Sequence, residues 1–318
     1  MFKLRTGYLI TGIVTGCIIL FSFFGTIPDG KLHVVFCNVG QGDAAYIRFP
    51  DGRDMVVDGG PDDKILGCLG KHMPFWDRSI DIVAMTHPQK DHMQGLIAVL
   101  ERYDVAYFIR SDVDNDTEGY KKLVSVIAKK AVPVRFVTAG ERIDIGFAII
   151  SMIWPSEEQI AHGKASVATR VDSNTSKTGN TLGATTVGEL NDYSLVFNLH
   201  YGAFDVLFTG DADNHVNKHF VGGQLADGQV EVLKVPHHGS KTGMTEEFLD
   251  WVFPRSRAGL EHATPLAVIS VGKNSYGHPA EATLDKLATR GVKIKRTDQE
   301  GDIEVVSDGA SWSVKTSH

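Results

Sequence analysis

The sequence predicts an α/β protein, a sandwich of two β-sheets with helices on its outer faces, preceded by one N-terminal transmembrane helix. Three observations lead to this prediction. The 318 residues are 42% hydrophobic and 22% charged, which is a globular composition. Strand-like and helix-like segments follow one another in a similar order in two successive halves of the sequence. This pattern favours two packed sheets with outer helices. Residues 6–28 contain no charged side chain, so they stand apart from the rest.

In the first half, short apolar or alternating segments predict strands, and apolar residues at helical spacing predict helices. Asp51 and Gly52 form a turn signal between the second and third of these strands. We expect strands at 32–38, 44–49, 54–57, 80–85, 107–110, 134–137 and 147–154, and helices at 64–72, 95–103 and 120–131.

Residues 156–189 separate the two halves and are rich in Ser, Thr, Gly, Asn and Lys, which predicts a flexible insertion loop. The second half then opens with a hairpin around Gly202 and Ala203. We expect strands at 194–201, 204–209, 230–235, 266–271, 294–296 and 303–306, and helices at 246–253 and 281–290. Residues 1–28 are therefore assigned to a membrane anchor or signal segment, and residues 29–318 to one domain.

The N-terminal segment predicts the compartment. Its 23 uncharged residues would form a helix about 34 Å long, enough for a hydrocarbon core of about 30 Å. Lys3 and Arg5 precede the segment, which places residues 29–318 outside the cytoplasm. A cleaved signal peptide is one alternative. A bacterial lipoprotein is another, because residues 14–17 are similar to a lipoprotein cleavage box ending in Cys17.

The charge balance disfavours a protein that binds nucleic acid through its bulk charge. Lys and Arg total 32 against 39 Asp and Glu, a net charge of −7, whereas that binding mode needs a basic surface. Basic residues nevertheless cluster after residue 230, where they could line a groove. They are Lys234, Lys241, Arg255, Arg257, Lys273, Lys293, Lys295 and Arg296.

The thirteen histidines, rather than the three cysteines, point to a functional site. Cys17, Cys37 and Cys68 stand at unrelated spacings, which excludes a disulfide scaffold and a Cys-cluster zinc site. Five histidines follow the ends of predicted strands, where α/β folds gather their sites: His87, His92, His237, His238 and His278. Zn²⁺ and similar ions bind His nitrogen and Asp oxygen, and catalytic sites keep an open position for water. The sequence therefore predicts a metal site at one edge of the sheets.

Four segments carry a resemblance to a known family. Residues 86–92, Thr-His-Pro-Gln-Lys-Asp-His, resemble the signature His-x-[His/Asp]-x-Asp-His of the metallo-β-lactamase superfamily. Residues 39–44 with 57–60, residues 233–240 and residues 276–279 extend the likeness to the extracytoplasmic hydrolase domain of ComEC-type competence proteins, over about residues 31–307. The resemblance implies a metallo-β-lactamase-like αββα sandwich. It also implies a phosphodiesterase that degrades one strand of incoming DNA, while other relatives hydrolyse phosphocholine esters, lactones or β-lactams.

The resemblance also implies roles for single residues. Five match metal ligands of the family: His87, Asp91, His92, Asp211 and His238. Asp211 matches an aspartate that bridges two ions. His238 is preferred to His237 as a ligand because it matches the histidine of a Pro-x-His-Gly motif. His237 and His278 are the expected catalytic side chains, which would contact the phosphate, stabilise developing charge or donate a proton.

Position 89 departs from the family signature. Gln89 stands where the superfamily has His or Asp, and Gln is a weak zinc ligand. Residues 191–194 resemble an Asn-containing variant of a motif that elsewhere supplies a His. We therefore expect one tightly held Zn²⁺ or Mn²⁺ ion and a second ion that is weak or absent. Asp58 is expected to orient the metal loop, and Asp43 to bond backbone nearby.

These observations predict a metal-dependent hydrolase, a phosphodiesterase or nuclease-like enzyme that is anchored to the membrane and acts outside the cytoplasm. Its partners would be a phosphodiester substrate, with DNA as one candidate, and the membrane itself. No obligate protein partner is inferred. One alternative is a small-molecule hydrolase of the same superfamily, acting on a phosphoester, lactone or β-lactam. The other is a catalytically degenerate metal-binding protein.

Overall fold

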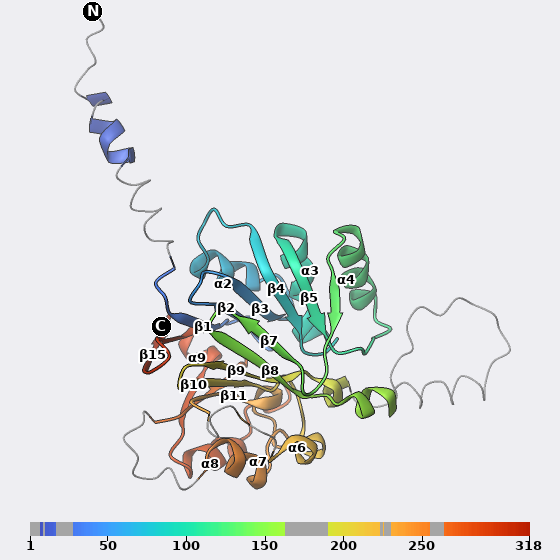
Figure 1. Cartoon of the computed structure of the whole chain (residues 1–318). Coiled ribbons are helices and arrows are strands. Elements are labelled where there is room, and N and C mark those ends of the chain that lie inside the picture. The colour runs from blue at the N-terminus through green and yellow to red at the C-terminus, as the bar shows by residue number, and fades with distance from the viewer. Residues whose placement is uncertain are drawn as a thin grey trace, which may run out of the picture.

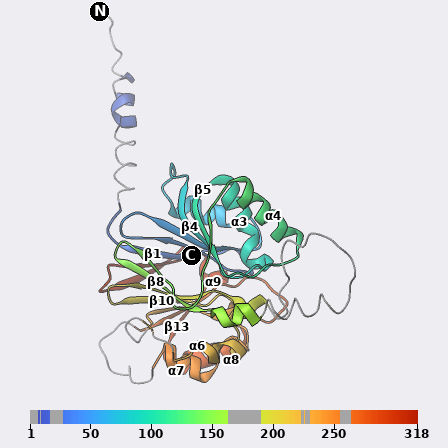
Figure 2. The ribbon, with the colours of Figure 1, turned by 45° about the vertical axis from the view of Figure 1, so that its right-hand side comes forward.

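Two β-sheets pack face to face, and helices cover the outer face of each sheet (Figures 1 and 2). This computed structural model describes residues 7, 8, 10–16, 28–162, 190–222, 225, 230–254 and 264–318. The α/β fold with two sheets and outer helices that the sequence predicts is confirmed.

The first sheet has eight strands and combines an antiparallel and a parallel part. In spatial order it contains β15 (Trp312–Thr316), β14 (Ile303–Ser307), β1 (Leu32–Phe36), β2 (Ala44–Arg48), β3 (Asp54–Gly59), β4 (Ser79–Met85), β5 (Asp104–Arg110) and β6 (Val134–Phe136). The last four strands run parallel to one another. On its outer face lie α2 (Ile65–His72), α3 (Lys90–Arg102) and α4 (Glu118–Lys129), which bury their apolar sides against it.

The second sheet has seven strands, four of them parallel. Its spatial order is β13 (Lys293–Arg296), β12 (Leu266–Ile269), β11 (Val232–Lys234), β10 (Phe204–Phe208), β9 (Val196–Tyr201), β8 (Ala148–Trp154) and β7 (Arg142–Ile145). Strands β10 to β13 run parallel. The helices and helical turns of this half are α6 (Asn214–Phe220), α7 (Glu246–Val252), α8 (Glu281–Ala288), α9 (Thr297–Glu300), η1 (Leu190–Tyr193) and η2 (Pro236–Gly239).

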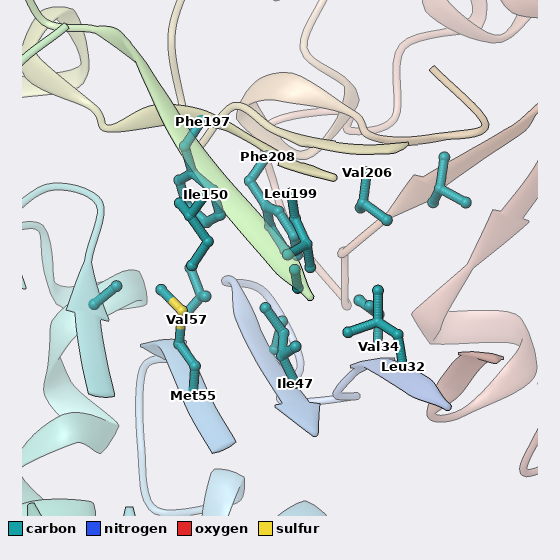
Figure 3. Packing of buried hydrophobic residues seen from close by; sticks show 14 of the residues in the cluster. Leu32, Val34, Ile47, Met55, Val57, Ile150, Phe197, Leu199, Val206 and Phe208 are labelled. Carbon is teal, nitrogen blue, oxygen red and sulfur yellow. The ribbon is translucent and has the colours of Figure 1, made fainter. Parts of the chain in front are cut away.

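The main core lies between the sheets. Val34 and Ile47 of the first sheet point toward Leu199 and Phe208 of the second, and each of these side chains is at most 2% exposed (Figure 3). Apolar surface removed from water in this way is the main favourable contribution to folding. The two halves of the sequence therefore form one sandwich, and the carboxyl ends of β4, β10, β11 and β12 are fixed relative to one another.

The predicted N-terminal membrane helix falls mostly outside the described residues. Of residues 6–28, the structure describes 7, 8, 10–16 and 28. Within the part of the chain that is described, no helix has the length and apolar character needed to cross a membrane.

The predicted loop at 156–189 also lies largely outside the described residues, which end at 162 and resume at 190. Its first part differs from the prediction. Residues 157–162 are helical, and Ile160 is buried against Val113 and Tyr193.

The cysteine spacings predict no disulfide scaffold, but two of the three cysteines do pair. Cys37, just after β1, and Cys68, on α2, form a disulfide with a Cα–Cα distance of 5.8 Å. Both residues lie in the buried cluster between the first sheet and its helices. Their spacing in the sequence carries no information about this contact, because the fold alone brings the end of β1 beside α2.

The disulfide predicts a measurable effect on stability. It closes a loop with a sequence separation of 31 residues. Loss of that constraint from the unfolded chain corresponds to about 3–4 kcal/mol. We expect Cys37→Ser/Cys68→Ser to lower the free energy of unfolding by this amount in urea titrations under oxidising conditions. Cys17→Ser is the matched control, and an equal loss in that variant would contradict the assignment.

Candidate metal centre

The start of α3 presents two predicted ligands, Asp91 and His92, from adjacent positions. Two close backbone contacts hold the start of α3 at the edge of the sheet. A Cβ at Gly95 would lie 2.0 Å from the carbonyl oxygen of Gly59, so only glycine allows α3 to lie this close to β3. The Asp43 amide also donates to the Asp91 carbonyl over 3.1 Å. His92 is consequently fully buried, while Asp91 stays partly exposed.

Asp211 follows the buried strand β10 through a tight turn at Gly210. Gly210 has φ +49°, and a Cβ there would lie 3.0 Å from the Cβ atoms of Thr86 and Ser194. The backbone amide of Asp211 donates to the Ser194 hydroxyl over 3.2 Å. The turn therefore fixes the direction of the Asp211 side chain, which is 1% exposed.

His237 and His238 follow β11 and adopt left-handed backbone conformations, with φ of 49° and 52°. Such conformations cost non-glycine residues about 1–3 kcal/mol each. Pro236 and Gly239 flank the pair, and a Cβ at Gly239 would meet the Cβ of Pro279 at 2.6 Å. The surrounding structure thus enforces a strained turn that directs both imidazoles to one edge of the sandwich.

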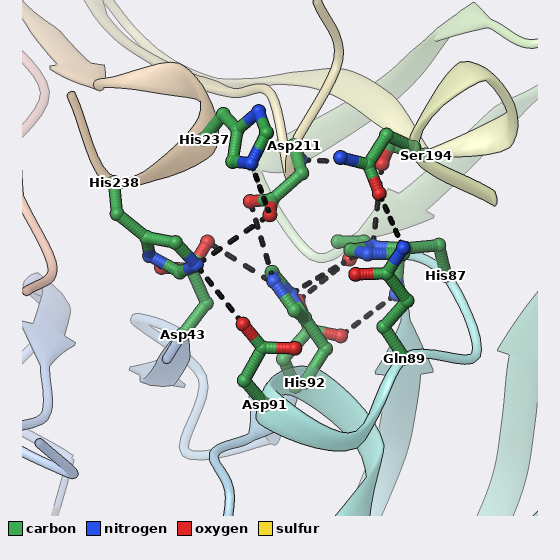
Figure 4. Close-up of polar contacts among 12 residues, drawn as sticks. Asp43, His87, Gln89, Asp91, His92, Ser194, Asp211, His237 and His238 are labelled. Atoms are coloured by element: carbon green, nitrogen blue, oxygen red, sulfur yellow. Dashed lines mark hydrogen bonds and ion pairs between the residues drawn. The ribbon is translucent and has the colours of Figure 1, made fainter. Parts of the chain in front are cut away.

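Four side chains from these three segments converge (Figure 4). Asp91, His92, Asp211 and His238 each offer one ligand atom, and these atoms all lie within 4.8 Å of one another. His92 Nε2 lies 3.2 Å from Asp211 Oδ1, and His238 Nε2 lies 3.5 Å from Asp211 Oδ2. His238 Nε2 is also 3.4 Å from Asp91 Oδ2. A donor set of two imidazoles and two carboxylates matches the preferences of Zn²⁺ and Mn²⁺.

The hydrogen bonds leave the ligand atoms free for a cation. His92 Nδ1 donates to Asp58 over 2.8 Å, and His238 Nδ1 donates to the Ser270 carbonyl over 2.9 Å. When a ring is neutral, these bonds leave a lone pair on Nε2. Both Nε2 atoms and Asp211 Oδ1 are buried without a hydrogen-bond partner in the described part of the chain. Buried polar atoms are rarely left unpaired, so the residues present fit a bound cation.

His87 joins the edge of this cluster. Its ring centroid lies 4.1 Å from that of His92, and the side chain is fully buried. Thr86 donates its hydroxyl hydrogen to Asp58 over 2.7 Å, so its oxygen can accept from His87 Nδ1 at 3.2 Å. His87 Nε2 is then left without a hydrogen-bond partner among the described residues. His87 lies outside the four-residue group, and its assignment as a ligand of a second ion stays a prediction.

Gln89 is engaged elsewhere. Its amide nitrogen donates to Asn191 Oδ1 over 2.7 Å, which joins the two positions where the sequence departs from the superfamily pattern. The Gln89 side chain is engaged in this hydrogen bond, and position 89 supplies neither an imidazole nor a carboxylate to a second ion. The sequence-based expectation of one tight ion therefore stays a prediction, now with a structural reason.

We expect one tightly bound divalent ion per chain, and we expect Gln89→Ala to leave that stoichiometry unchanged. The four converging ligands do not include position 89. Equilibrium dialysis of the oxidised, disulfide-bonded chain against Zn²⁺, followed by elemental analysis, measures the ratio. Two tightly held ions per wild-type chain, or loss of the single ion in Gln89→Ala, would contradict this assignment.

The charges of the cluster depend strongly on one another. Burial lowers the pKa of His92 and His238, but nearby carboxylates outweigh it. Asp211 and Asp58 raise the pKa of His92 well above its usual value, and Asp211 and Asp43 raise that of His238 to about 10. His87 behaves oppositely, since burial and then the His92 charge lower its pKa to about 3. In the metal-free chain at neutral pH, His92 and His238 therefore carry protons and His87 does not.

These shifts predict how metal affinity depends on pH. A cation must displace a proton from His92 and from His238, whereas His87 has none to lose. For each ring that must lose a proton, the metal affinity rises about tenfold per pH unit until the pH reaches the pKa of that ring. We expect Zn²⁺ affinity, measured against a competing chelator, to rise from pH 6 to pH 8. A flat profile would show that these rings are not ligands.

The predicted catalytic histidines lie at the rim of the cluster. His237 Nε2 is 3.9 Å from Asp211 Oδ2, and His237 Nδ1 is 3.4 Å from Asp213 Oδ2. The His237 side chain is 25% exposed, whereas that of His238 is 2% exposed. The His278 ring lies 5.5 Å from that of His237. The structure thus places His238 inside the cluster, and His237 and His278 where a substrate could reach them.

Sequence reasoning missed the buried ion pair behind the cluster. Lys234 Nζ lies 2.5 Å from Asp43 Oδ2, and Lys234 is 3% exposed. Asp43 Oδ1 in turn lies 3.2 Å from His238 Nδ1. The expectation that Lys234 lines a surface groove is therefore wrong. A buried lysine needs a partner for its charge. The only sign of this burial in the sequence was that Lys234 ends an apolar strand.

Two further residues of the predicted basic groove have acidic partners. Lys295 pairs with Glu300, and Arg296 pairs with Asp298 over 2.7 Å. Arg255 and Arg257 lie outside the described residues. Lys241, Lys273 and Lys293 are exposed.

No family model matches the chain. ComE operon protein 3 of Bacillus subtilis (strain 168) is 22% identical over 314 residues, which cover 93% of this chain and 36% of that protein. This chain is similar to competence proteins. Competence protein ComA of Neisseria gonorrhoeae is 33% identical over 115 residues, 36% of this chain and 15% of that protein. The chain spans about a third or less of the curated relatives it matches.

Structural neighbours of the chain are metallo-β-lactamase fold proteins. YhfI from Bacillus subtilis, described as a metallo-beta-lactamase fold protein, has a TM-score of 0.49 at 11% identity and covers 87% of this chain and 100% of its own. Tm1679, described as a metal-dependent hydrolase of the beta-lactamase superfamily, has a TM-score of 0.49 at 13% identity, with 86% and 98% covered. The likeness to competence proteins that the motifs indicate is confirmed by the curated relatives.

Proposed function

We propose that the chain is a divalent-metal-dependent phosphodiesterase that acts outside the cytoplasm, with DNA as a substrate. The observation that carries the proposal is the convergence of Asp91, His92, Asp211 and His238, with both Nε2 atoms buried and unpartnered in the described structure. Hydrogen bonds engage the Nδ1 side of each ring, whereas each Nε2 has no hydrogen-bond partner among the described residues and faces only carboxylates of the same cluster. A cation supplies the missing partner.

The side chains divide into those that hold the cation and those that meet the substrate. Asp91, His92, Asp211 and His238 would hold it, and Asp58 keeps His92 in the required orientation. A divalent cation supplies Lewis-acid chemistry, because it lowers the pKa of a water molecule and polarises a phosphoryl oxygen.

His237 and His278 would contact the substrate at the rim. Asp213, 3.4 Å from His237 Nδ1, orients the His237 ring so that its other nitrogen can donate to a phosphoryl oxygen. His278 lies beside His237, where it can contact the same phosphate or donate a proton. Both roles act on charge that develops on the phosphate oxygens.

Two observations support the choice of compartment and substrate. The Cys37–Cys68 disulfide is typical of oxidising compartments outside the cytoplasm, which fits the uncharged segment at residues 6–28 as a membrane anchor. One relative is named a competence protein and another, from Haemophilus influenzae, a recombination protein, and both names refer to processes that handle DNA.

The reaction class is tested with the full chain in detergent. A chromogenic phosphodiester, single-stranded DNA, plasmid DNA and a chromogenic β-lactam are assayed with added Zn²⁺ or Mn²⁺, then with a chelator. We expect the phosphodiester and DNA to be hydrolysed, and we expect the chelator to stop hydrolysis reversibly. Hydrolysis of the β-lactam alone would place the chain among the small-molecule hydrolases. A tightly bound ion without any hydrolysis would identify a degenerate metal-binding protein.

A further inference from the structure

A second group of metal-ligating side chains lies around the disulfide. Cys68 Sγ and ligand atoms of His72 and Asp302 all lie within 4.8 Å of one another, and Cys37 is bonded to Cys68. This group shares no residue with the cluster at the sheet edge. Reduction of the disulfide would give two thiols beside an imidazole and a carboxylate, a four-ligand set of the kind that binds Zn²⁺.

The helix α2 and the neighbouring ends of β1 and β14 bring these residues together. Cys68 and His72 are four residues apart on α2, so they lie on one face of the helix. Cys37 and Asp302 flank the paired residues Phe36 and Ile303, at neighbouring ends of β1 and β14. The Asn38 amide donates to Asp302 Oδ1 over 2.9 Å, which directs the other carboxylate oxygen toward α2.

The His72 ring is placed as a ligand rather than as a hydrogen-bonding group. Its Nε2 is buried and has no hydrogen-bond partner in the described part of the chain. It lies 3.7 Å from Asp302 Oδ2. That separation is too long for a hydrogen bond. It is close to the spacing of two ligands on one tetrahedral ion, about 3.3–3.8 Å for bonds of 2.0–2.3 Å.

An ion has an entry path and a balanced charge at this position. His72 lines a cavity of about 430 Å³ that Lys71 and Glu304 also line. Two thiolates and one carboxylate around a divalent ion leave one negative charge. Lys71, whose side chain is 62% exposed, lies 2.8 Å from Asp302 Oδ2 and can offset that charge.

We infer that Cys37, Cys68, His72 and Asp302 form a Zn²⁺ site when the disulfide is reduced. The oxidised chain ties β1 to α2 through the disulfide, and the reduced chain would tie them through the metal ion. In the reduction step, a dithiol donates two electrons and two protons to the disulfide and becomes a disulfide itself. In the binding step, the two thiols release two protons as their sulfurs bind the cation.

Co²⁺ binding tests the inference with wild-type full chain, because the cluster at the sheet edge contains no thiol and gives no thiolate-to-Co²⁺ charge-transfer absorption. The chain is reduced with a dithiol, freed of it under argon and titrated with Co²⁺ beside an oxidised sample. We expect the charge-transfer band, and one additional ion per chain, in the reduced sample alone. Zn²⁺ should then displace the Co²⁺ and abolish the band.

Variants assign the band to these residues. Cys17→Ser should keep it, because that cysteine is not part of the group. Cys37→Ser and Cys68→Ser should each lose it, and His72→Ala should weaken Co²⁺ binding. A reduced wild-type chain without the band overturns the inference, including a chain whose circular dichroism shows that it has unfolded. A band that survives in Cys37→Ser/Cys68→Ser also overturns it. These outcomes are independent of hydrolysis, so the proposed function can stand or fail separately.

Discussion

Asp211→Asn is expected to abolish tight metal binding and phosphodiester hydrolysis together. Asp211 faces the Nε2 atoms of both imidazoles of the cluster, 3.2 Å from His92 and 3.5 Å from His238. The amide has nearly the same volume, so packing around Gly210 is preserved while the negative charge is lost. Removal of a single hydrogen-bond donor from an active site already lowers rates about 10²–10³-fold. Loss of a shared carboxylate ligand should cost more than that.

The measurement compares metal content and kcat of Asp211→Asn with those of wild type. Asp144→Asn is the matched control, because it makes the same chemical change at an exposed residue on β7, where the side chain is 62% exposed. We expect the control to retain both properties. Full activity in Asp211→Asn would remove Asp211 from the metal centre, and with it the main reason for this assignment.

Asp58→Asn is expected to lower metal affinity or activity about 10–100-fold, since Asp58 orients a ligand without being one. Its carboxylate accepts hydrogen bonds from the Thr86 amide over 2.8 Å, from the Thr86 hydroxyl and from His92 Nδ1. An amide offers one accepting oxygen in place of two. A buried donor left unsatisfied also costs about 1–3 kcal/mol of stability.

Chelator competition and urea unfolding measure the two effects of Asp58→Asn. Asp54→Asn is the matched control on the same strand, because Asp54 is also buried but bonds the Asp81 amide instead of a metal-binding segment. We expect Asp54→Asn to leave metal affinity unchanged. Equal losses of affinity in both variants would mean that Asp58 acts only through the stability of β3.

The parts of the site that could be predicted are those that local patterns encode. Compact apolar strands that end in His or Asp residues predicted where Asp91, His92, Asp211 and His238 would lie, because parallel strands share one carboxyl edge. The start of α3 was predicted at residue 95, but the helix begins at Lys90. Its first turn carries polar ligands rather than apolar residues, so the apolar periodicity begins too late.

The missed features depend on contacts between distant segments. Lys234 ends an apolar strand and would ordinarily reach solvent, but Asp43 holds it inside. Cys37 and Cys68 meet because α2 packs beside the end of β1. The Gln89–Asn191 hydrogen bond links positions 102 residues apart. None of these pairs has a local sequence signal, and each one lies within or beside a proposed metal site.

Anomalous diffraction from crystals of the full chain grown with Zn²⁺ tests the central claim most directly. The claim is that Asp91, His92, Asp211 and His238 hold a divalent cation. It predicts a strong peak about 2.0–2.3 Å from a ligand atom of each of these side chains. A fully occupied zinc site elsewhere, with no peak among these four residues, would contradict it.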